Sequence, residues 1–102
     1  MEPIEINLTE YKMLNELRYS TFGLQMKRVL RAMFGGKSVP LTVKGSKREV
    51  DSFFDALVKE KKYMASYLAN GLDDPRTLRN RARLDNSVSK FEKETGIMWP
   101  FK

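Results

Sequence analysis

Apolar and polar residues alternate in two short stretches of the chain, residues 4–8 and residues 39–44. Because successive side chains of a strand point to opposite faces, this period of two predicts two short strands, at about 4–8 and 39–44. Pro40 places the second strand at an edge or at its start, since proline donates no hydrogen bond to a neighbouring strand. We therefore expect the two strands to pair with each other.

Three longer stretches repeat apolar residues at spacings of three and four, which predicts amphipathic helices over about 10–34, 47–69 and 75–95. Ser20, Thr21 and Gly23 interrupt the first stretch, so it holds either two helices or one helix with a bend. The predicted fold class is mainly α (α+β), with three or four helices packed around one core and two short strands.

The ends of the last two helices carry cap signals. Ser46–Glu49 has the spacing of a capping box, and Asp74 precedes Pro75 at the start of the last helix. Gly71 and Gly96 each follow a helix, and we expect Gly71 to adopt a left-handed cap. These signals place both helices within a residue or two.

Apolar spacing also predicts which side chains form the core. The expected core side of the 47–69 helix consists of Val50, Phe53, Phe54, Leu57, Met64 and Leu68, with the Lys61 stem along its edge. The last helix contributes Leu84, Val88 and Phe91. Among the remaining aromatic residues, we expect Phe22 and Phe34 in the core.

The chain has 102 residues, the size of a single domain (1–102), and contains neither cysteine nor histidine. Disulfides, zinc sites of the usual Cys/His type and Ser-His or Cys-His catalysis are thereby excluded. No nucleophile–base pair and no acid–base pair can be assembled from the sequence. We therefore expect no enzyme activity, no bound metal and no cofactor.

Gly36-Lys37-Ser38 looks like the end of a phosphate-binding P-loop. The first glycine of that motif would fall at Arg31, and Gly35 cannot replace it. The order of elements is also reversed, because a helix ends here and a strand begins, whereas a P-loop leads from a strand into a helix. We interpret the segment as a helix stop followed by a basic loop.

Charge becomes informative on the last helix. The chain carries 19 Lys and Arg against 13 Asp and Glu, a net charge of +6. At roughly 100° per residue, Arg76, Arg79, Arg83 and Lys90 fall within about 60° of each other and opposite the apolar side chains. Arginines suit phosphate or carboxylate recognition, so we predict a nucleic-acid-binding stripe at these four residues.

Two alternatives stay open for this chain. The basic stripe binds an acidic protein surface, or it is an ordinary solvated helix side. The C-terminal stretch "MWPFK" either folds back over the core or offers Trp99 and Phe101 as partner-binding anchors. Whether Lys59, Lys61 and Lys62 on the preceding helix join the stripe is a tertiary question.

The segment "GLDDPRTLRNRARLDNSVSKFEKETGIMWPFK" resembles the C-terminal end of small accessory proteins of T4-like tailed bacteriophages. The resemblance covers about a third of the chain and carries no functional motif. It implies a protein that acts in the bacterial cytoplasm by binding, as a modulator or inhibitor of a host protein or of nucleic-acid handling.

No apolar run approaches the ~20 residues of a membrane span, and the acidic start "MEPIEINLTE" lacks the features of a signal peptide. We expect a cytoplasmic protein that does not contact membranes.

Overall fold

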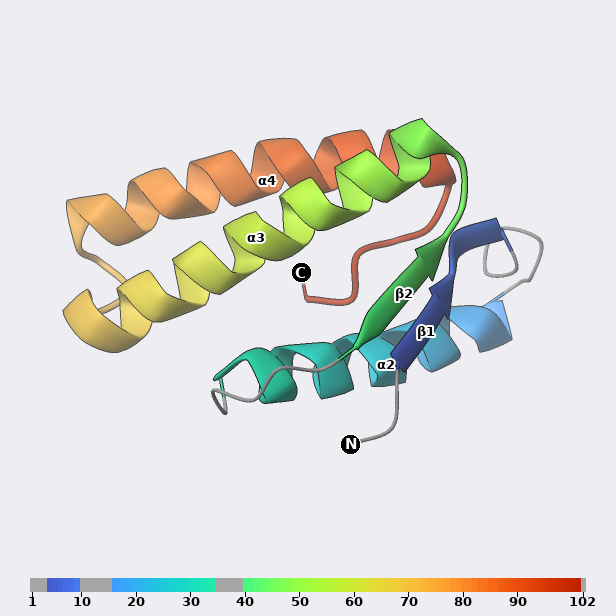
Figure 1. The fold of residues 1–102 in the computed structure, drawn as a ribbon. Helices are drawn as coiled ribbons and strands as arrows, with labels where there is room; N and C mark the ends of the chain where they lie inside the picture. Colours follow the sequence, from blue (N-terminus) through green and yellow to red (C-terminus); the bar gives the residue numbers. More distant parts are fainter. Residues whose placement is uncertain (1–3, 10–15, 35–39, 102) are drawn as a thin grey trace.

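The computed structural model describes residues 4–9, 16–34 and 40–101. Its elements follow in the order β1 (Ile4–Asn7), α2 (Glu16–Phe34), β2 (Leu41–Lys44), α3 (Lys47–Asn70) and α4 (Pro75–Thr95). The fold is mainly helical, with helices packed together and two short strands, which confirms the predicted fold class (Figure 1).

The two strands pair with each other in parallel, with Ile4 opposite Leu41 and Asn7 opposite Lys44. A parallel pair needs a crossover connection, and α2 lies within that connection. Ile4 and Ile6 are buried, whereas Glu5 is exposed and forms an ion pair with Lys44 at 3.2 Å. Both strands are shorter than predicted, because Leu8 is already helical and Pro40 precedes β2.

Helix α2 continues through Ser20, Thr21 and Gly23. The residues Glu16–Phe34 therefore form one helix and not two. Its buried positions include Phe22, Met26, Val29 and Leu30. The first residues of the stretch predicted as helical, 10–15, lie outside the described part of the chain.

Helices α3 and α4 form an antiparallel hairpin that lies across the core from α2 (Figure 1). The capping box is confirmed at the start of α3: the Ser46 amide donates to Glu49 Oε1 at 2.9 Å, and the Glu49 amide donates to Ser46 Oγ at 3.2 Å. Gly96 ends α4 in the left-handed conformation, with φ 73°. Gly71 has φ 90° but ψ 162°, so the left-handed cap predicted there is wrong, although α3 does end at Asn70.

The core side of α3 differs from the predicted one. Phe53, Ala56, Leu57 and Glu60 are buried on α3, whereas Phe54, predicted in the core, is 39% exposed. Leu68 is 70% exposed, and Phe34 at the end of α2 is 42% exposed. Helix α4 packs against one flank of α3, and Phe54 and Leu68 lie on the other flank. The apolar stripe in the sequence does not show which flank α4 covers.

The C-terminal tail after Gly96 enters the interior between the three helices. The Trp99 ring lies near the rings of Phe91, Phe53 and Phe22, at centroid distances of 5.3, 6.2 and 6.4 Å. These three phenylalanines belong to α4, α3 and α2, so a single indole joins these three helices. The core is thus closed by the tail, and the outer surface of the hairpin stays free for other contacts.

Candidate nucleic-acid interface

The predicted stripe lies on the outer side of α4. The buried residues of the same helix determine which side faces outward. The helix buries Thr77, Leu84, Val88, Phe91 and Thr95, and these residues turn the opposite side outward. All four cations of the stripe, Arg76, Arg79, Arg83 and Lys90, are exposed. The structure thus agrees with the sequence on where these side chains lie.

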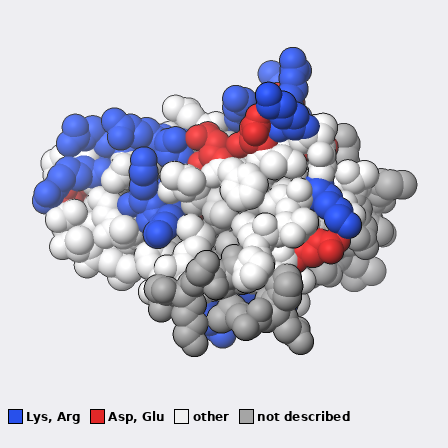
Figure 2. All heavy atoms as spheres, in the orientation of Figure 1, with Lys and Arg blue, Asp and Glu red and all other residues white. Residues whose placement is uncertain are grey.

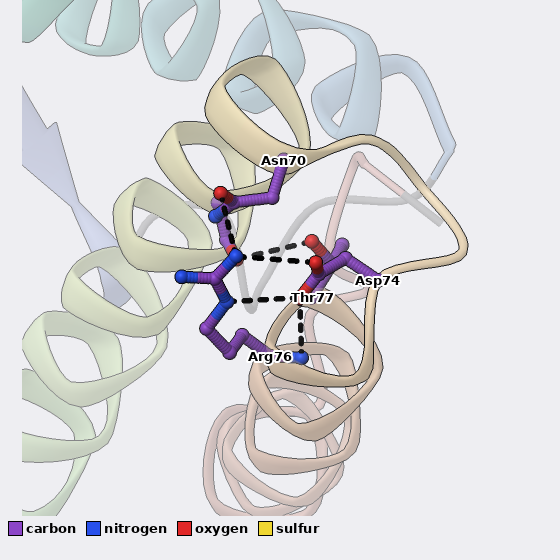
Figure 3. Close-up of polar contacts among 5 residues, drawn as sticks. Asn70, Asp74, Arg76 and Thr77 are labelled. Atoms are coloured by element: carbon purple, nitrogen blue, oxygen red, sulfur yellow. Dashed lines mark hydrogen bonds and ion pairs between the residues drawn. The ribbon is translucent and has the colours of Figure 1, made fainter.

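Arg76 differs from the other three because it is held by its own chain (Figure 3). Its Nε donates to Asp74 Oδ1 at 3.0 Å, and its Nη2 donates to Asp74 Oδ2 at 3.2 Å and to Asn70 Oδ1 at 3.0 Å. Asp74 also caps α4 by accepting from the Arg76 amide at 2.8 Å. Arg76 therefore links the end of α3 to the start of α4, and its charge is largely balanced.

The hydrogen bonds from Arg76 also change the pKa of the Asp74 carboxyl group. The side-chain hydrogen bond from Arg76, followed by the bond from its amide, lowers the pKa of Asp74 below its ordinary value. In return, the hydrogen bond to Asp74 raises the pKa of Arg76. Arg79, Arg83 and Lys90 make no hydrogen bond or ion pair with any residue that the structure describes, so they are the cations available to a ligand.

Lysines of α3 adjoin this stripe along the seam between the two helices. Asp55 accepts from Lys59 at 3.0 Å. Its pKa is lowered by a hydrogen bond from Ser87 on α4, then by Lys59 and by the charge of Lys90. Asp55 thus lies where α3 meets α4, with Lys59 and Lys90 close by.

The same seam continues toward the connecting turn. Ser66 Oγ and Thr77 Oγ1 form a buried hydrogen bond of 3.1 Å, followed by the Asn70–Arg76 hydrogen bond. Lys62 lies seven residues after Asp55 and four before Ser66, so helical spacing places it on this side. Lys61 lies seven residues after Phe54 and therefore points to the other flank of α3.

The cations that share this side of the hairpin are hereafter the basic face: Lys59, Lys62, Arg76, Arg79, Arg83 and Lys90. Figure 2 shows Lys and Arg side chains gathered over the end of the molecule where α3 and α4 approach their connecting turn. The sequence predicted the α4 members of this face, but their connection with Lys59 and Lys62 depends on the pairing of the helices.

The other basic clusters do not join the basic face. Lys27, Arg28 and Arg31 are exposed on α2, which lies across the core from α4 (Figure 1). Lys47 and Arg48 begin α3 at the end remote from Asn70. Lys37 and the whole P-loop-like segment Gly36-Lys37-Ser38 lie outside the described residues.

The two predicted anchors, Trp99 and Phe101, are not on an open surface. Trp99 is 1% exposed, and its indole N–H donates to Glu60 Oε1 at 2.9 Å. Its amide donates to Glu92 Oε2 at 2.9 Å. Phe101 is half-buried against Trp99. The sequence left two roles open for the tail, packing onto the core and anchoring a partner. The burial of Trp99 agrees with packing onto the core.

A cavity of about 340 Å³, lined by both polar and apolar side chains, lies beneath the hairpin, on the flank opposite the basic face. Its lining residues come from α3, α4 and the tail: Tyr63, Arg81, Leu84, Asp85, Val88, Trp99 and Phe101. Arg81 and Asp85 are four residues apart on α4, yet they form no ion pair in the part of the chain that the structure describes.

Glu60 is a buried acid that the sequence interpretation missed. Its side chain is 1% exposed, and burial raises the pKa of its carboxyl, opposed by the Trp99 hydrogen bond and assisted by the charge of Asp85. The available signal was its position seven residues after Phe53, which places it on the core side of α3. Within the described residues, no cluster of three or more acidic side chains could hold a metal ion.

None of the helices in the described part of the chain combines the length and apolarity needed to cross a membrane. Comparisons with protein-family models, with curated proteins and with solved structures found no match to the chain. The resemblance of its last third to accessory proteins of tailed phages therefore stays a prediction, and functional inference depends on the basic face.

Proposed function

We propose that this chain is a non-enzymatic binding protein that contacts nucleic acid through the basic face. The supporting observation is that Arg79, Arg83 and Lys90 are exposed on one side of α4 and form no hydrogen bond or ion pair with any described residue. Lys62 extends the same side on α3. Cations gathered in this way neutralise phosphates and release the counterions condensed on a nucleic acid.

The two arginines of this set, Arg79 and Arg83, have the chemistry for this role. Each guanidinium can donate two parallel hydrogen bonds to one phosphate, which an ammonium group cannot do. Asn86 and Ser89 are exposed on the same helix and add short polar donors that suit phosphate and sugar contacts. Arg76 would contribute chiefly by fixing the helix ends, because Asp74 and Asn70 already occupy its donors.

The test is a fluorescence-anisotropy titration with labelled duplex and single-stranded oligonucleotides at several salt concentrations. We expect binding that weakens linearly on a log–log plot of affinity against salt. Replacing Arg79 and Arg83 together by glutamine should reduce the steepness of that plot by about two, roughly one for each phosphate that is no longer neutralised.

Matched controls exist on the same two helices. Arg81→Gln and Lys61→Gln remove the same kinds of charge from the opposite flanks and should leave affinity within about twofold, as long-range attraction alone changes little at moderate salt. Absence of binding to every probe in dilute salt contradicts the proposal. Equal reductions of affinity in the face variants and the control variants contradict it as well.

A second candidate function is binding to an acidic protein surface, and one observation favours it. Three leucines near the connecting turn are largely exposed: Leu68 (70%), Leu72 (61%) and Leu78 (54%). Exposed apolar side chains next to cations are typical of protein contacts. Pull-down from nuclease-treated bacterial lysate, repeated with Leu72→Ser, separates the two functions, because this change should remove a protein partner and spare nucleic-acid binding.

A further inference from the structure

We infer that the cavity beneath the hairpin binds a small zwitterion with an apolar body, the chemistry of a free apolar α-amino acid. The cavity lies on the flank of α4 opposite the basic face, and the inference does not depend on the proposed function. Three features of the lining residues carry it: two opposite charges at the mouth, an apolar floor, and the size of the space.

The mouth of the cavity carries one positive and one negative side chain. Arg81 and Asp85 are the exposed members of the lining on α4, and neither forms a hydrogen bond or ion pair with any described residue. Four residues apart on a helix, their Cβ atoms are about 5–6 Å from each other. An acid that precedes a base by four residues pairs better than the reverse order, and here the base comes first. Both charges are therefore available to a ligand.

The floor of the cavity is apolar. Leu84 and Val88, 5% and 4% exposed, follow Arg81 by three and seven residues and so share its side of α4. The tail adds Trp99, whose indole N–H already donates to Glu60 Oε1 at 2.9 Å. The indole therefore has no donor left for a ligand and offers its ring as an apolar wall.

Two further groups relate the mouth to the interior. After burial, the charge of Asp85 also raises the pKa of the Glu60 carboxyl, so the Asp85 carboxylate lies close to the buried Glu60–Trp99 pair. Tyr63 lines the cavity from α3, and its hydroxyl forms no hydrogen bond with a described residue. This hydroxyl is a neutral donor that a ligand carboxylate can use.

A zwitterion satisfies the mouth, whereas a ligand with a single charge does not. A carboxylate alone would pair with Arg81 and be repelled by Asp85, and an amine alone would meet the opposite problem. In an α-amino acid both charged groups are attached to one carbon, which suits two opposite charges one helical turn apart. The volume of about 340 Å³ lies within the ~300–1,000 Å³ typical of small-molecule sites.

The experiment follows the fluorescence of Trp99, the one tryptophan of the chain, while L-phenylalanine or L-leucine is titrated into the full chain. Each amino acid has two analogues that lack one charged group and add no bulk. Hydrocinnamate and isocaproate lack the ammonium group, and phenethylamine and isoamylamine lack the carboxylate. We expect at least one amino acid to bind about tenfold more tightly than both of its analogues, because each analogue loses a charged hydrogen bond.

Variants at the mouth assign the two charges. Arg81→Gln should weaken binding of that amino acid about tenfold and spare its amine analogue, whereas Asp85→Asn should weaken the amino acid similarly and spare its carboxylate analogue. Arg48→Gln and Asp51→Asn are matched controls, since they remove the same charges from exposed positions at the start of α3. Both controls should keep affinity within about twofold, and circular dichroism checks that every variant is folded.

Three results would overturn this inference: equal affinities for an amino acid and its analogues, equal effects of the mouth variants and the controls, or no response to either amino acid up to its solubility limit. None of these results affects the proposed function, because the titrations contain no nucleic acid and the mouth lies away from the basic face.

Discussion

At the scale of single residues, the most consequential side chain is the buried carboxyl of Glu60. It accepts the indole N–H of Trp99 from the tail, and the charge of Asp85 on α4 is close enough to affect it. Tyr63 and Arg81 line the adjoining cavity. Burial favours the protonated form of this carboxyl, and the protonated form still accepts from Trp99 through its carbonyl oxygen.

The raised pKa of Glu60 predicts how stability depends on pH. The folded chain holds this proton to a higher pH than the unfolded chain, in which the pKa is near the ordinary 4.5. The contribution of Glu60 to the free energy of unfolding therefore falls as pH rises from about 4.5 through the raised pKa. Glu60→Gln stays neutral and keeps an acceptor for Trp99, so it should be more stable than the parent at neutral pH.

The measurement is urea unfolding of both proteins across a pH series. The difference in unfolding free energy should be small in acid and should grow in favour of Glu60→Gln toward neutral pH. Taking the difference removes the opposite contribution of Asp55, whose pKa is lowered by Ser87 and Lys59. Asp51→Asn, an exposed change on the same helix, serves as the control. A parent that is the more stable at neutral pH would contradict the assignment.

At the scale of elements, the packing of α3 against α4 depends on small polar side chains as well as on the core. Beyond Glu60 and Leu84, the residues buried along the outer half of the hairpin are Ser66 and Thr77, joined by one hydrogen bond of 3.1 Å. This small pair allows the two helices to approach closely.

This pair predicts a non-additive double-mutant cycle. Thr77→Val leaves the Ser66 hydroxyl buried without its partner, which should cost about 1–3 kcal/mol of unfolding free energy. Ser66→Ala leaves Thr77 in the same condition at a similar cost. The double variant replaces both hydroxyls by apolar groups and should cost less than the sum of the two, measured by chemical denaturation. Strict additivity would show that the hydroxyls do not interact.

Local signals predicted most of the element boundaries, since caps and turns depend on neighbouring residues. Ser46 with Glu49, Asp74 with Pro75, and Gly96 all act as their local chemistry predicts. What the sequence could not show is which flank of α3 meets α4, because periodicity defines a stripe but not the direction of a neighbouring helix.

The candidate site divides in the same way. Arg79, Arg83 and Lys90 share one side of one helix, so spacing alone could group them. Lys62 and Asn70 both belong to α3. The place of Lys62 beside the α4 cations and the hydrogen bond from Arg76 to Asn70 therefore depend on how α3 packs against α4. The orientation of Trp99 was undecidable for the same reason, since its partner Glu60 lies on α3, well before it in the sequence.

At the scale of the whole molecule, the tail determines whether the helices hold together. Trp99 packs near aromatic rings of α2, α3 and α4, and Ile97 is buried beside it. The tail is fastened by the Ile97 amide, which donates to Thr95 Oγ1 at 3.1 Å, and by both nitrogens of Trp99. The tail is thus an integral part of the core.

Removal of this indole should destabilise the entire fold. Trp99→Ala is expected to lower the unfolding free energy by about 3–5 kcal/mol, the usual cost of truncating a buried large aromatic residue. Met98→Ala, at a neighbouring position that is 56% exposed, should cost less than about 0.5 kcal/mol. Both are measured by chemical denaturation followed by circular dichroism. Similar costs for the two variants would show that the tail contributes little to the core.

The parallel pairing of β1 with β2 has a consequence for the order in which the chain assembles. Ile4 reaches Leu41 only across the whole length of α2, and Trp99 reaches Phe22 across most of the chain. Helices α3 and α4 meet through a short turn, so the entropy cost of closing their loop is small. The hairpin that carries the basic face can therefore form early, while the sheet and the tail set the folding rate through their distant contacts.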